Sequence, residues 1–196
     1  AARQEIVRRY YDALCERRQG KDVDHAVYKL ELLMQQAGVT TAERSVVAQA
    51  NQLAEETGEP AMAIELPDGQ MVTGKTSDTL GAASALLLNA LKAVGGIGDQ
   101  FELISAQVLE PVCRLKTQYL GHKNPRLHTD EVLMALTISA LTNPLAELAQ
   151  QQLPKLRGCD AHFSVIISEE DAKLYKRLGI NVSCEARYET KKLYHK

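Results

Sequence analysis

The stretch GQMVTGKT, residues 69–76, restricts the possible folds most, because it fits two incompatible structures. It matches the phosphate-loop pattern G-x-x-x-x-G-K-[ST], whose variable positions are usually small because several backbone N–H groups surround one anion. Here Val72 and Thr73 are β-branched and favour extended backbone. The preceding Pro67-Asp68-Gly69 is typical of a tight turn. We therefore predict a β-hairpin with arms at 61–66 and 70–74.

A second test concerns the carboxylate that holds magnesium in nucleotide hydrolases, which follows an apolar strand. The two candidate strands, at 101–104 and 163–167, are followed by Ser105 and Ser168 rather than by Asp. This weakens the nucleotide interpretation. The sequence GKTS at 74–77 still precedes a run of helical spacing from Leu80 to Val94, and a helix N-terminus can hold an anion. The alternative is that Thr76 or Ser77 only caps that helix.

Apolar residues at helical spacing predict most of the remaining elements. Two helices, ending near Gly20 and Gly38, should form an antiparallel hairpin, and a capping box at 40–43 should start a third helix that ends near Thr57. A helix from Ser105 should direct Leu115 and Tyr119 inward. A helix is expected at 132–141, capped by Thr129; it is apolar nearly all round and should lie at the centre of the core. Further helices are expected from Asn143-Pro144 and from Ser168 to Gly179. A last strand is expected at 182–186.

This order of elements predicts an α/β fold, with α+β as the alternative. We expect layers in which helices flank a small mixed sheet that includes the hairpin near 61–74, preceded by the N-terminal helical hairpin. Residues 1–58 form the helical segment and residues 59–196 the α/β core. Together they form one domain, for which 196 residues suffice.

Composition excludes several classes of protein. The net charge of −2 gives no field that calls for nucleic acid or an anionic membrane surface. The longest apolar run, Leu80 to Ala93, is too short and too interrupted to span a bilayer. Four dispersed cysteines predict reduced thiols rather than a disulfide framework or a zinc site. With no leader visible, we expect a cytoplasmic protein, and the start at Ala-Ala-Arg-Gln suggests a fragment of a longer chain.

The segment from His122 to Glu131 has the strongest functional character, because it places several charged and imidazole side chains at a loop-to-helix junction. Lys123 and Arg126 can hold a phosphate or carboxylate, and His128 can act as acid or base. The structural alternative is that Arg126 binds nearby carbonyls and His128 helps to cap the helix. The predicted anion-binding residues are Lys75, Thr76, Ser77, Lys123, Asn124, Arg126 and His128.

The sequence gives weaker support to a metal site or a serine nucleophile. A metal site would use His122, His128, Asp130 or Glu131, but their spacing fits no established ligand pattern, so we predict no metal. Ser105 and Ser168 follow candidate strands as a nucleophile would. Neither lies in G-x-S-x-G, which favours helix capping for both. The sequence leaves open whether the protein is an enzyme and identifies no cofactor.

Several long stretches resemble the C-terminal part of a large bacterial family with a domain of unknown function. They are ELPDGQMVTGKTSDTLGAASALLLNALK, LEPVCRLKTQYLGHKNPRLHTDEVLMALTISALTNP and YKRLGINVSCEARY, and the resemblance extends over essentially all 196 residues. It implies a two-domain parent whose N-terminal half carries a better Gly-rich phosphate-type loop. Some relatives are labelled ATP-dependent peptidases, but this chain shows no H-E-x-x-H and no recognisable Ser or Cys nucleophile constellation.

These observations give three hypotheses of function. The first is a domain that closes an anion-binding cleft, for a nucleotide or phosphometabolite, against the missing N-terminal domain. It requires the loops 74–77 and 122–128 to lie on one face. The second is a non-catalytic interaction module that presents a broad apolar face on residues 1–38 to that domain or to another subunit of a homo-oligomer. The third is a metal-dependent hydrolase. No nucleic-acid or membrane partner is expected.

Overall fold

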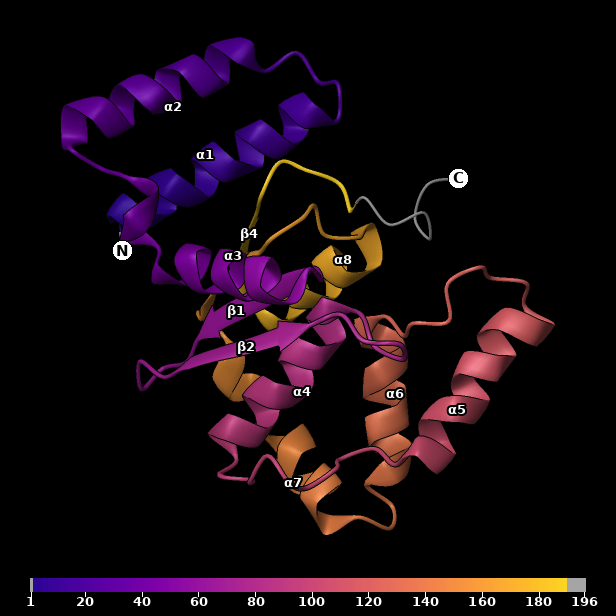
Figure 1. The fold of residues 1–196 in the computed structure, drawn as a ribbon. Helices are drawn as coiled ribbons and strands as arrows, with labels where there is room; N and C mark the ends of the chain where they lie inside the picture. Colours follow the sequence, from indigo (N-terminus) through magenta and orange to yellow (C-terminus); the bar gives the residue numbers. More distant parts are fainter. Residues whose placement is uncertain (1, 190–196) are drawn as a thin grey trace.

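A mixed sheet of four strands lies at the centre of the molecule (Figure 1). The computed structural model describes residues 2–189. The strand order is β2-β1-β3-β4, in which β1 pairs antiparallel with both β2 and β3, and β3 pairs parallel with β4. This confirms the predicted α/β fold with a small mixed sheet flanked by helices. The strands are β1 (Ala61–Glu65), β2 (Met71–Lys75), β3 (Asp160–Phe163) and β4 (Asn181–Cys184).

The phosphate-loop-like stretch is one arm of a β-hairpin, as predicted. Glu65 of β1 pairs with Met71 of β2, and the N–H of Gly69 donates to the carbonyl of Leu66 at 2.9 Å to close the turn. Gly69 has φ of 84°, a conformation that favours glycine. Because residues 71–75 pair with β1, their backbone N–H groups cannot gather round a phosphate.

The second glycine of the pattern, Gly74, has a packing role. Helix α4 (Ala82–Val94) lies directly on β2, and a Cβ built on Gly74 would overlap the backbone of Leu86, with the Leu86 Cα at 2.6 Å. Only a residue without a side chain allows this approach of helix to strand. The match to the phosphate-loop pattern at this position therefore reflects helix–sheet packing.

Alternating side chains of β1 face two layers. Ala63 packs against Val46 and Ala50 of α3 (Ser45–Thr57), whereas Met62 and Ile64 face the main core beneath α4. Burial on both faces explains why the first four residues of this strand, 61–64, are all apolar. The main core is completed by α6 (Thr129–Ser139), α7 (Pro144–Gln151), the short η3 (Leu153–Leu156) and α8 (Glu169–Leu178), which connects β3 to β4.

The predicted N-terminal hairpin consists of α1 (Ala2–Arg18) and α2 (Asp24–Ala37), which pack side by side at the top of Figure 1. Helix α1 folds onto the chain's own core, because Tyr11 is buried with its ring centroid 4.8 Å from that of His162, and the Cys15 thiol donates to the Cys184 carbonyl at 3.3 Å. The apolar face expected on residues 1–38 is therefore largely covered. What stays exposed lies on α2, at Tyr28, Leu32 and Leu33.

The capping box predicted at 40–43 is wrong. Residues Thr41–Glu43 form a single 3-10 turn, η1, and α3 begins at Ser45. Between them Arg44 is extended and only 2% exposed, because its guanidinium donates to the Asp160 carboxylate at 3.0 Å and to two sheet carbonyls. These tertiary bonds keep Arg44 extended at a position where the sequence pattern predicted a continuous helix.

Two of the predicted strands also differ from the strands in the structure. Residues 101–104 form no strand, although Leu103 is buried, and the carbonyls of Glu102 and Leu103 accept from the Asn143 side chain instead. Strand β3 ends at Phe163, where 163–167 was expected, because the chain beyond Ser164 leaves β1 and the N–H of Ile166 donates to the backbone carbonyl of Arg187 at 2.8 Å. Short apolar runs indicate burial but do not identify a strand.

The α5–α6 region is more open than predicted. Helix α5 (Ala106–Arg114) continues into a π-helical turn, η2 (Leu115–Tyr119), in which Leu115 and Tyr119 are exposed rather than inward. Helix α6 buries one face, and its Met134 is 66% exposed, so the expectation of a helix surrounded by core is wrong.

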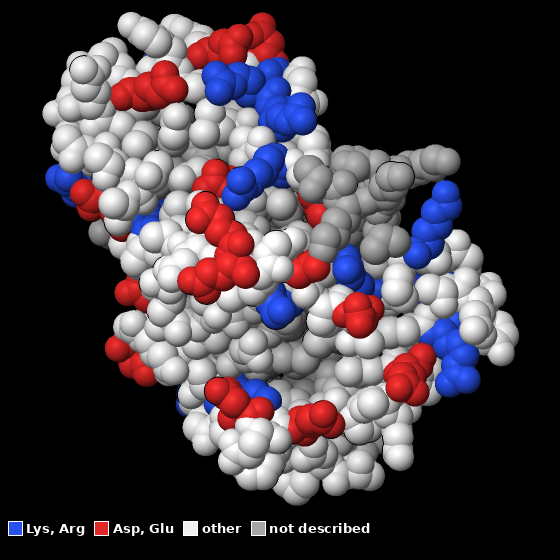
Figure 2. Space-filling model, viewed as in Figure 1, with Lys and Arg blue, Asp and Glu red and all other residues white. Residues whose placement is uncertain are grey.

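No helix of the described residues is long and apolar enough to cross a membrane. Figure 2 shows acidic and basic side chains interspersed over the visible face.

Candidate anion-binding site

A cavity of about 380 Å³ lies where three helices begin. Gly81 precedes α4, His128 precedes α6 and Ser168 precedes α8, and all three residues line it. A helix N-terminus carries partial positive charge from its unpaired N–H groups. Three such ends meet at the cavity, and described side chains already accept N–H groups at the starts of α6 and α8.

The start of α4 is the end best suited to a ligand. Its N-cap is Gly81, with φ of −67° and ψ of 159°, and no side chain of the described residues caps the helix. Gly81, Ala82 and Ala83 all belong to the cavity wall. By contrast, Ser168 Oγ accepts the N–H of Asp171 in α8 at 3.2 Å. The first-turn N–H groups of α4 are therefore the donors that a bound anion can satisfy.

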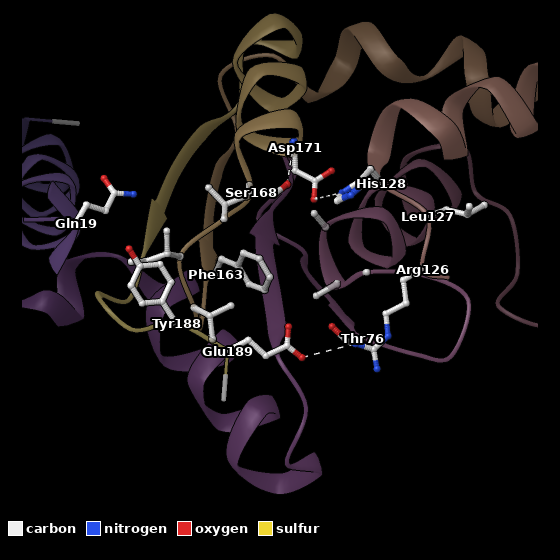
Figure 3. Close-up of a pocket in the computed structure, with 16 residues that line it drawn as sticks. Gln19, Thr76, Arg126, Leu127, His128, Phe163, Ser168, Asp171, Tyr188 and Glu189 are labelled. Atoms are coloured by element: carbon white, nitrogen blue, oxygen red, sulfur yellow. Dashed lines mark hydrogen bonds and ion pairs between the residues drawn. The ribbon is translucent and has the colours of Figure 1, made fainter. Parts of the chain in front are cut away.

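Arg126 supplies a cation to the same cavity and is only 9% exposed. Its Nε donates to the carbonyl of Ser77 at 2.7 Å, and Nη1 lies 3.6 Å from the Glu189 carboxylate (Figure 3). Nη1 has no hydrogen-bond partner among the described residues. The backbone at Arg126 is fixed as well, since its N–H donates to Asn124 Oδ1 at 3.0 Å and its carbonyl accepts from Lys116 Nζ at 2.6 Å.

The loops 74–77 and 122–128 meet on one face, as the anion-binding hypothesis requires. Besides the Arg126–Ser77 bond, the N–H of Leu127 donates to the Thr79 carbonyl at 2.9 Å, and Ser84 Oγ donates to the Leu127 carbonyl at 2.8 Å. These bonds join the two loops to the first turn of α4. The sequence pattern therefore identified two loops that the fold brings together.

His128 and Asp171 form the polar wall opposite. Asp171 Oδ1 accepts the N–H and hydroxyl of Thr129 at 2.9 and 2.8 Å, and Oδ2 lies 3.7 Å from His128 Nδ1. The carboxylate raises the pKa of His128 above its ordinary value, although burial opposes the shift. Burial alone would raise the pKa of Asp171, but the bonds from His128 and Thr129 outweigh it and hold that pKa below its usual range.

The predicted residues divide into three groups. Thr76, Arg126 and His128 line the cavity, and Ser77 and Asn124 hold Arg126 in place through the bonds above. Lys75 and Lys123 are exposed and lie outside the cavity wall.

The structure corrects two of the capping predictions and confirms a third. Helix α4 begins at Ala82, so neither Thr76 nor Ser77 caps it. Helix α6 is preceded by His128 as N-cap residue, whose N–H donates to Glu131 Oε2 at 2.8 Å, so Thr129 is its first residue rather than its cap. Ser168 caps α8, as predicted for this serine.

The sequence interpretation missed Gly81, Phe163 and Glu189, which also line the cavity. A signal existed for Gly81, since glycine is accepted at N-cap positions and here directly precedes a run of helix formers. Asp171 was predicted only as a residue within the helix expected from Ser168 to Gly179. Nothing local marked Glu189, because it reaches Arg126 across 63 residues of chain.

A second polar cluster resembles a catalytic triad but is sealed. His162 Nδ1 lies 2.8 Å from Ser183 Oγ, and Nε2 lies 3.2 Å from Glu185. Both His162 and Ser183 are at most 1% exposed, so no substrate can reach the hydroxyl. Burial lowers the pKa of His162 below its ordinary value, against the opposing effect of Glu185. The cluster ties β3 to β4 and belongs to the core.

The metal hypothesis gains no geometric support. The described residues contain no group of three His, Cys, Asp or Glu side chains placed to hold a metal ion. His128 faces Asp171, whereas Asp130 is exposed and accepts the N–H of Glu131 at 2.9 Å.

Comparison with known proteins agrees with the expected place of this chain in a longer protein. It is 47% identical over all 196 residues to a UPF0371 protein of Corynebacterium glutamicum, and 48% and 44% identical to UPF0371 proteins of Corynebacterium efficiens and Streptococcus pyogenes. The chain spans about 40% of the length of these relatives. Residues 42–194 match a family model described as "Domain of unknown function DUF1846, C-terminal". The chain therefore belongs to the family of DUF1846 C-terminal domains.

Proposed function

We propose that this domain binds a small anionic ligand in the cavity at the start of α4, as one wall of a cleft completed by the rest of the longer protein. The observation that carries the proposal is the juxtaposition of an uncapped helix N-terminus with the guanidinium of Arg126, which is nine-tenths buried. Backbone N–H groups and a bidentate guanidinium are the donors that proteins use for carboxylates and phosphates. Desolvation strengthens both interactions.

His128 adds a charge that depends on pH. Because its pKa is raised by Asp171, the imidazolium persists to higher pH than for an exposed histidine. A protonated His128 strengthens anion binding, so affinity should fall as the pH rises through its pKa. The role of His128 as catalytic acid or base stays a prediction; its imidazole faces the Asp171 carboxylate.

The test is titration of the full-length protein, and of the 196-residue chain, with phosphate, ATP and simple carboxylates by calorimetry. Arg126→Gln should weaken the binding of any ligand of this cavity about tenfold to a hundredfold, through loss of charge-assisted hydrogen bonds. Lys123→Gln is the matched control, because it removes a cation from the adjoining loop outside the wall. Equal affinities in both variants and the natural protein would overturn the proposal.

A second candidate is the interaction module, which the exposed apolar side chains favour. Tyr28 on α2 is 63% exposed, and Met134 and Ile138 lie one turn apart on the open face of α6 at 66% and 58%. Sedimentation of the full-length protein over a range of concentrations separates the two. A mass that rises with concentration, and is reduced by Ile138→Glu, supports an oligomeric contact. A constant monomer mass removes the homo-oligomer.

A further inference from the structure

We infer that the open face of α6, formed by Met134, Ile138 and Leu141, is the surface on which the rest of the longer protein packs. The inference rests on the part of the proposed function in which that protein completes the cleft, and it names the surface of contact. It does not depend on what the cavity binds. Four features carry it: the exposure of this face, the weak burial of its neighbour α5, the size of the part outside this chain, and the connection to the cavity.

Helix α6 is apolar on two sides, and the core covers only one of them. Met134 and Ile138 lie one turn apart, and Leu141 follows in the turn that ends the helix, where its N–H donates to the Ile138 carbonyl at 3.2 Å. Leu141 is 83% exposed, whereas Val132 and Leu136 on the opposite side are fully buried. On soluble proteins a contiguous exposed apolar patch of this kind marks a contact surface.

The open face of α6 lies between two neighbouring elements. On one side Glu131 accepts a hydrogen bond from Lys116 of η2 at 3.0 Å, and on the other Thr137 Oγ1 accepts one from Gln150 of α7 at 3.1 Å. With about 3.6 residues per turn, Glu131 and Thr137 fall on opposite sides of the exposed stripe. Exposed apolar side chains continue onto η2, at Leu115 and Tyr119.

Helix α5 is weakly buried in the same region. None of the described residues Ala106–Arg114 is buried, and the apolar ones, such as Val108 and Val112, are only partly covered by the core. In Figure 1, α5 lies at the edge of the molecule, beside α6 and away from the sheet. A helix this short is marginal by itself in water and depends on packing. A further body against α5 and α6 supplies that packing.

The rest of the longer protein is the body that fits this surface best. The chain spans about 40% of the length of its relatives, and its family model describes a C-terminal domain, so more than half of the longer protein lies outside it. That part is tethered to this domain, which gives it an effective concentration on the order of millimolar. A second copy would have to compete at its far lower concentration in solution.

The open face of α6 is also connected to the cavity. His128, which precedes α6, lines the cavity, and its N–H donates to Glu131 at 2.8 Å. Buried Lys116 donates to the same Glu131 oxygen and to the carbonyl of Arg126 at 2.6 Å. One hydrogen-bonded unit therefore joins the edge of the face to the cavity loop. A body that packs on α6 lies beside the cleft that it is proposed to complete.

The experiment measures thiol labelling of the folded full-length protein by N-ethylmaleimide. Ile138→Cys places a thiol on the open face of α6, and Lys123→Cys places one at an exposed loop position as the matched control. Peptide mass spectrometry follows each new thiol separately from the four natural cysteines. The thiol at position 138 should react at least about tenfold more slowly than the one at 123, because the packed surfaces must open first. Equal rates would overturn the inference.

Sedimentation of the same samples distinguishes the rest of the chain from a second copy. Slow labelling in a monomer assigns the cover to the protein's own chain. If the protein is an oligomer, Ile138→Glu should leave its mass unchanged, and a fall to the monomer mass would overturn the inference in favour of a second copy. Glutamate is a good helix former and the position is exposed in this domain, so the domain itself should fold.

A second pair of variants tests the packing directly. Adding Ile138→Glu to Met134→Cys should raise the labelling rate of the thiol at position 134, because a carboxylate on the contact surface opposes packing. Adding Lys123→Glu should not, and an equal effect of both would contradict the inference. The anion titrations are independent of these rates. A protected face without Arg126-dependent anion binding removes the anion site alone, and an open face with such binding removes only this inference.

Discussion

Replacing Gly81 tests whether the N-terminus of α4 is open. At this position glycine is not needed for its backbone, since φ of −67° and ψ of 159° suit any residue. A Cβ added there would meet only the Leu127 carbonyl, at 3.8 Å, which is an ordinary contact. Gly81→Ser can therefore place a hydroxyl at the first-turn N–H groups of α4. Gly81→Ala is the matched control, because it adds the Cβ without the hydroxyl.

The expected magnitude follows from capping energetics. Serine at an N-cap is worth about 0.5–2 kcal/mol more than alanine, typically about 1. Both variants also restrict the unfolded chain relative to glycine, which stabilises by about 0.4–1 kcal/mol and cancels from the comparison. For a chain of this length, 1 kcal/mol shifts the Tm by about 2–4 °C. Gly81→Ser should thus melt about 2–4 °C above Gly81→Ala.

Thermal unfolding followed by circular dichroism measures the difference in Tm. Calorimetric titration measures the affinity for the anion. The serine hydroxyl occupies the donors that a ligand needs, so Gly81→Ser should bind the Arg126-dependent anion more weakly than Gly81→Ala. Equal Tm values for the two variants would show that the first-turn N–H groups of α4 are not open to a cap. A stabilised Ser variant with undiminished anion affinity would place the ligand elsewhere.

Three further predictions concern packing and charge. Gly74→Ala should destabilise by about 1–3 kcal/mol in urea unfolding, because its Cβ meets the Leu86 backbone; a neutral result would refute the packing role. Arg44→Ala should cost about 3 kcal/mol by the same assay, since it leaves Asp160 and two sheet carbonyls without their donor, and a loss below 1 kcal/mol would contradict this. The raised pKa of His128 adds stability that is complete below about pH 6.5 and is lost as the pH rises through its folded pKa, so His128→Gln should flatten the dependence of Tm on pH in that window.

Local patterns predicted the elements that depend on neighbouring residues. The turn at 67–69 and the β-branched arm were enough to predict the hairpin, and Asn143 caps α7 through its bond to the N–H of Leu145 at 3.0 Å, as expected. Two of the errors share one cause. Arg44 leaves the helix for bonds to the sheet, and Leu103 and Ile104 are buried without a strand partner. In both places distant contacts outweigh a local preference.

Half of the candidate site was predictable, because the residues concerned are marked by their neighbours in the chain. Arg126 and His128 lie in a loop whose composition marks function, and the sequence alone directed attention to them and to Thr76. It could not show that α4 begins at Ala82, that Gly81 leaves its N-terminus open, or that Glu189 returns to face the guanidinium.

The sequence by itself thus determined a hairpin instead of a phosphate loop, because turn chemistry and β-branched backbone preference act within a few residues. The tertiary structure decided why Gly74 is glycine, through the approach of α4 to β2. It also decided which charges face one another in the cavity, because Arg126, Asp171 and Glu189 are adjacent only when sheet and helices have packed. Pairing across such distances depends on the geometry of the folded core, which no local pattern encodes.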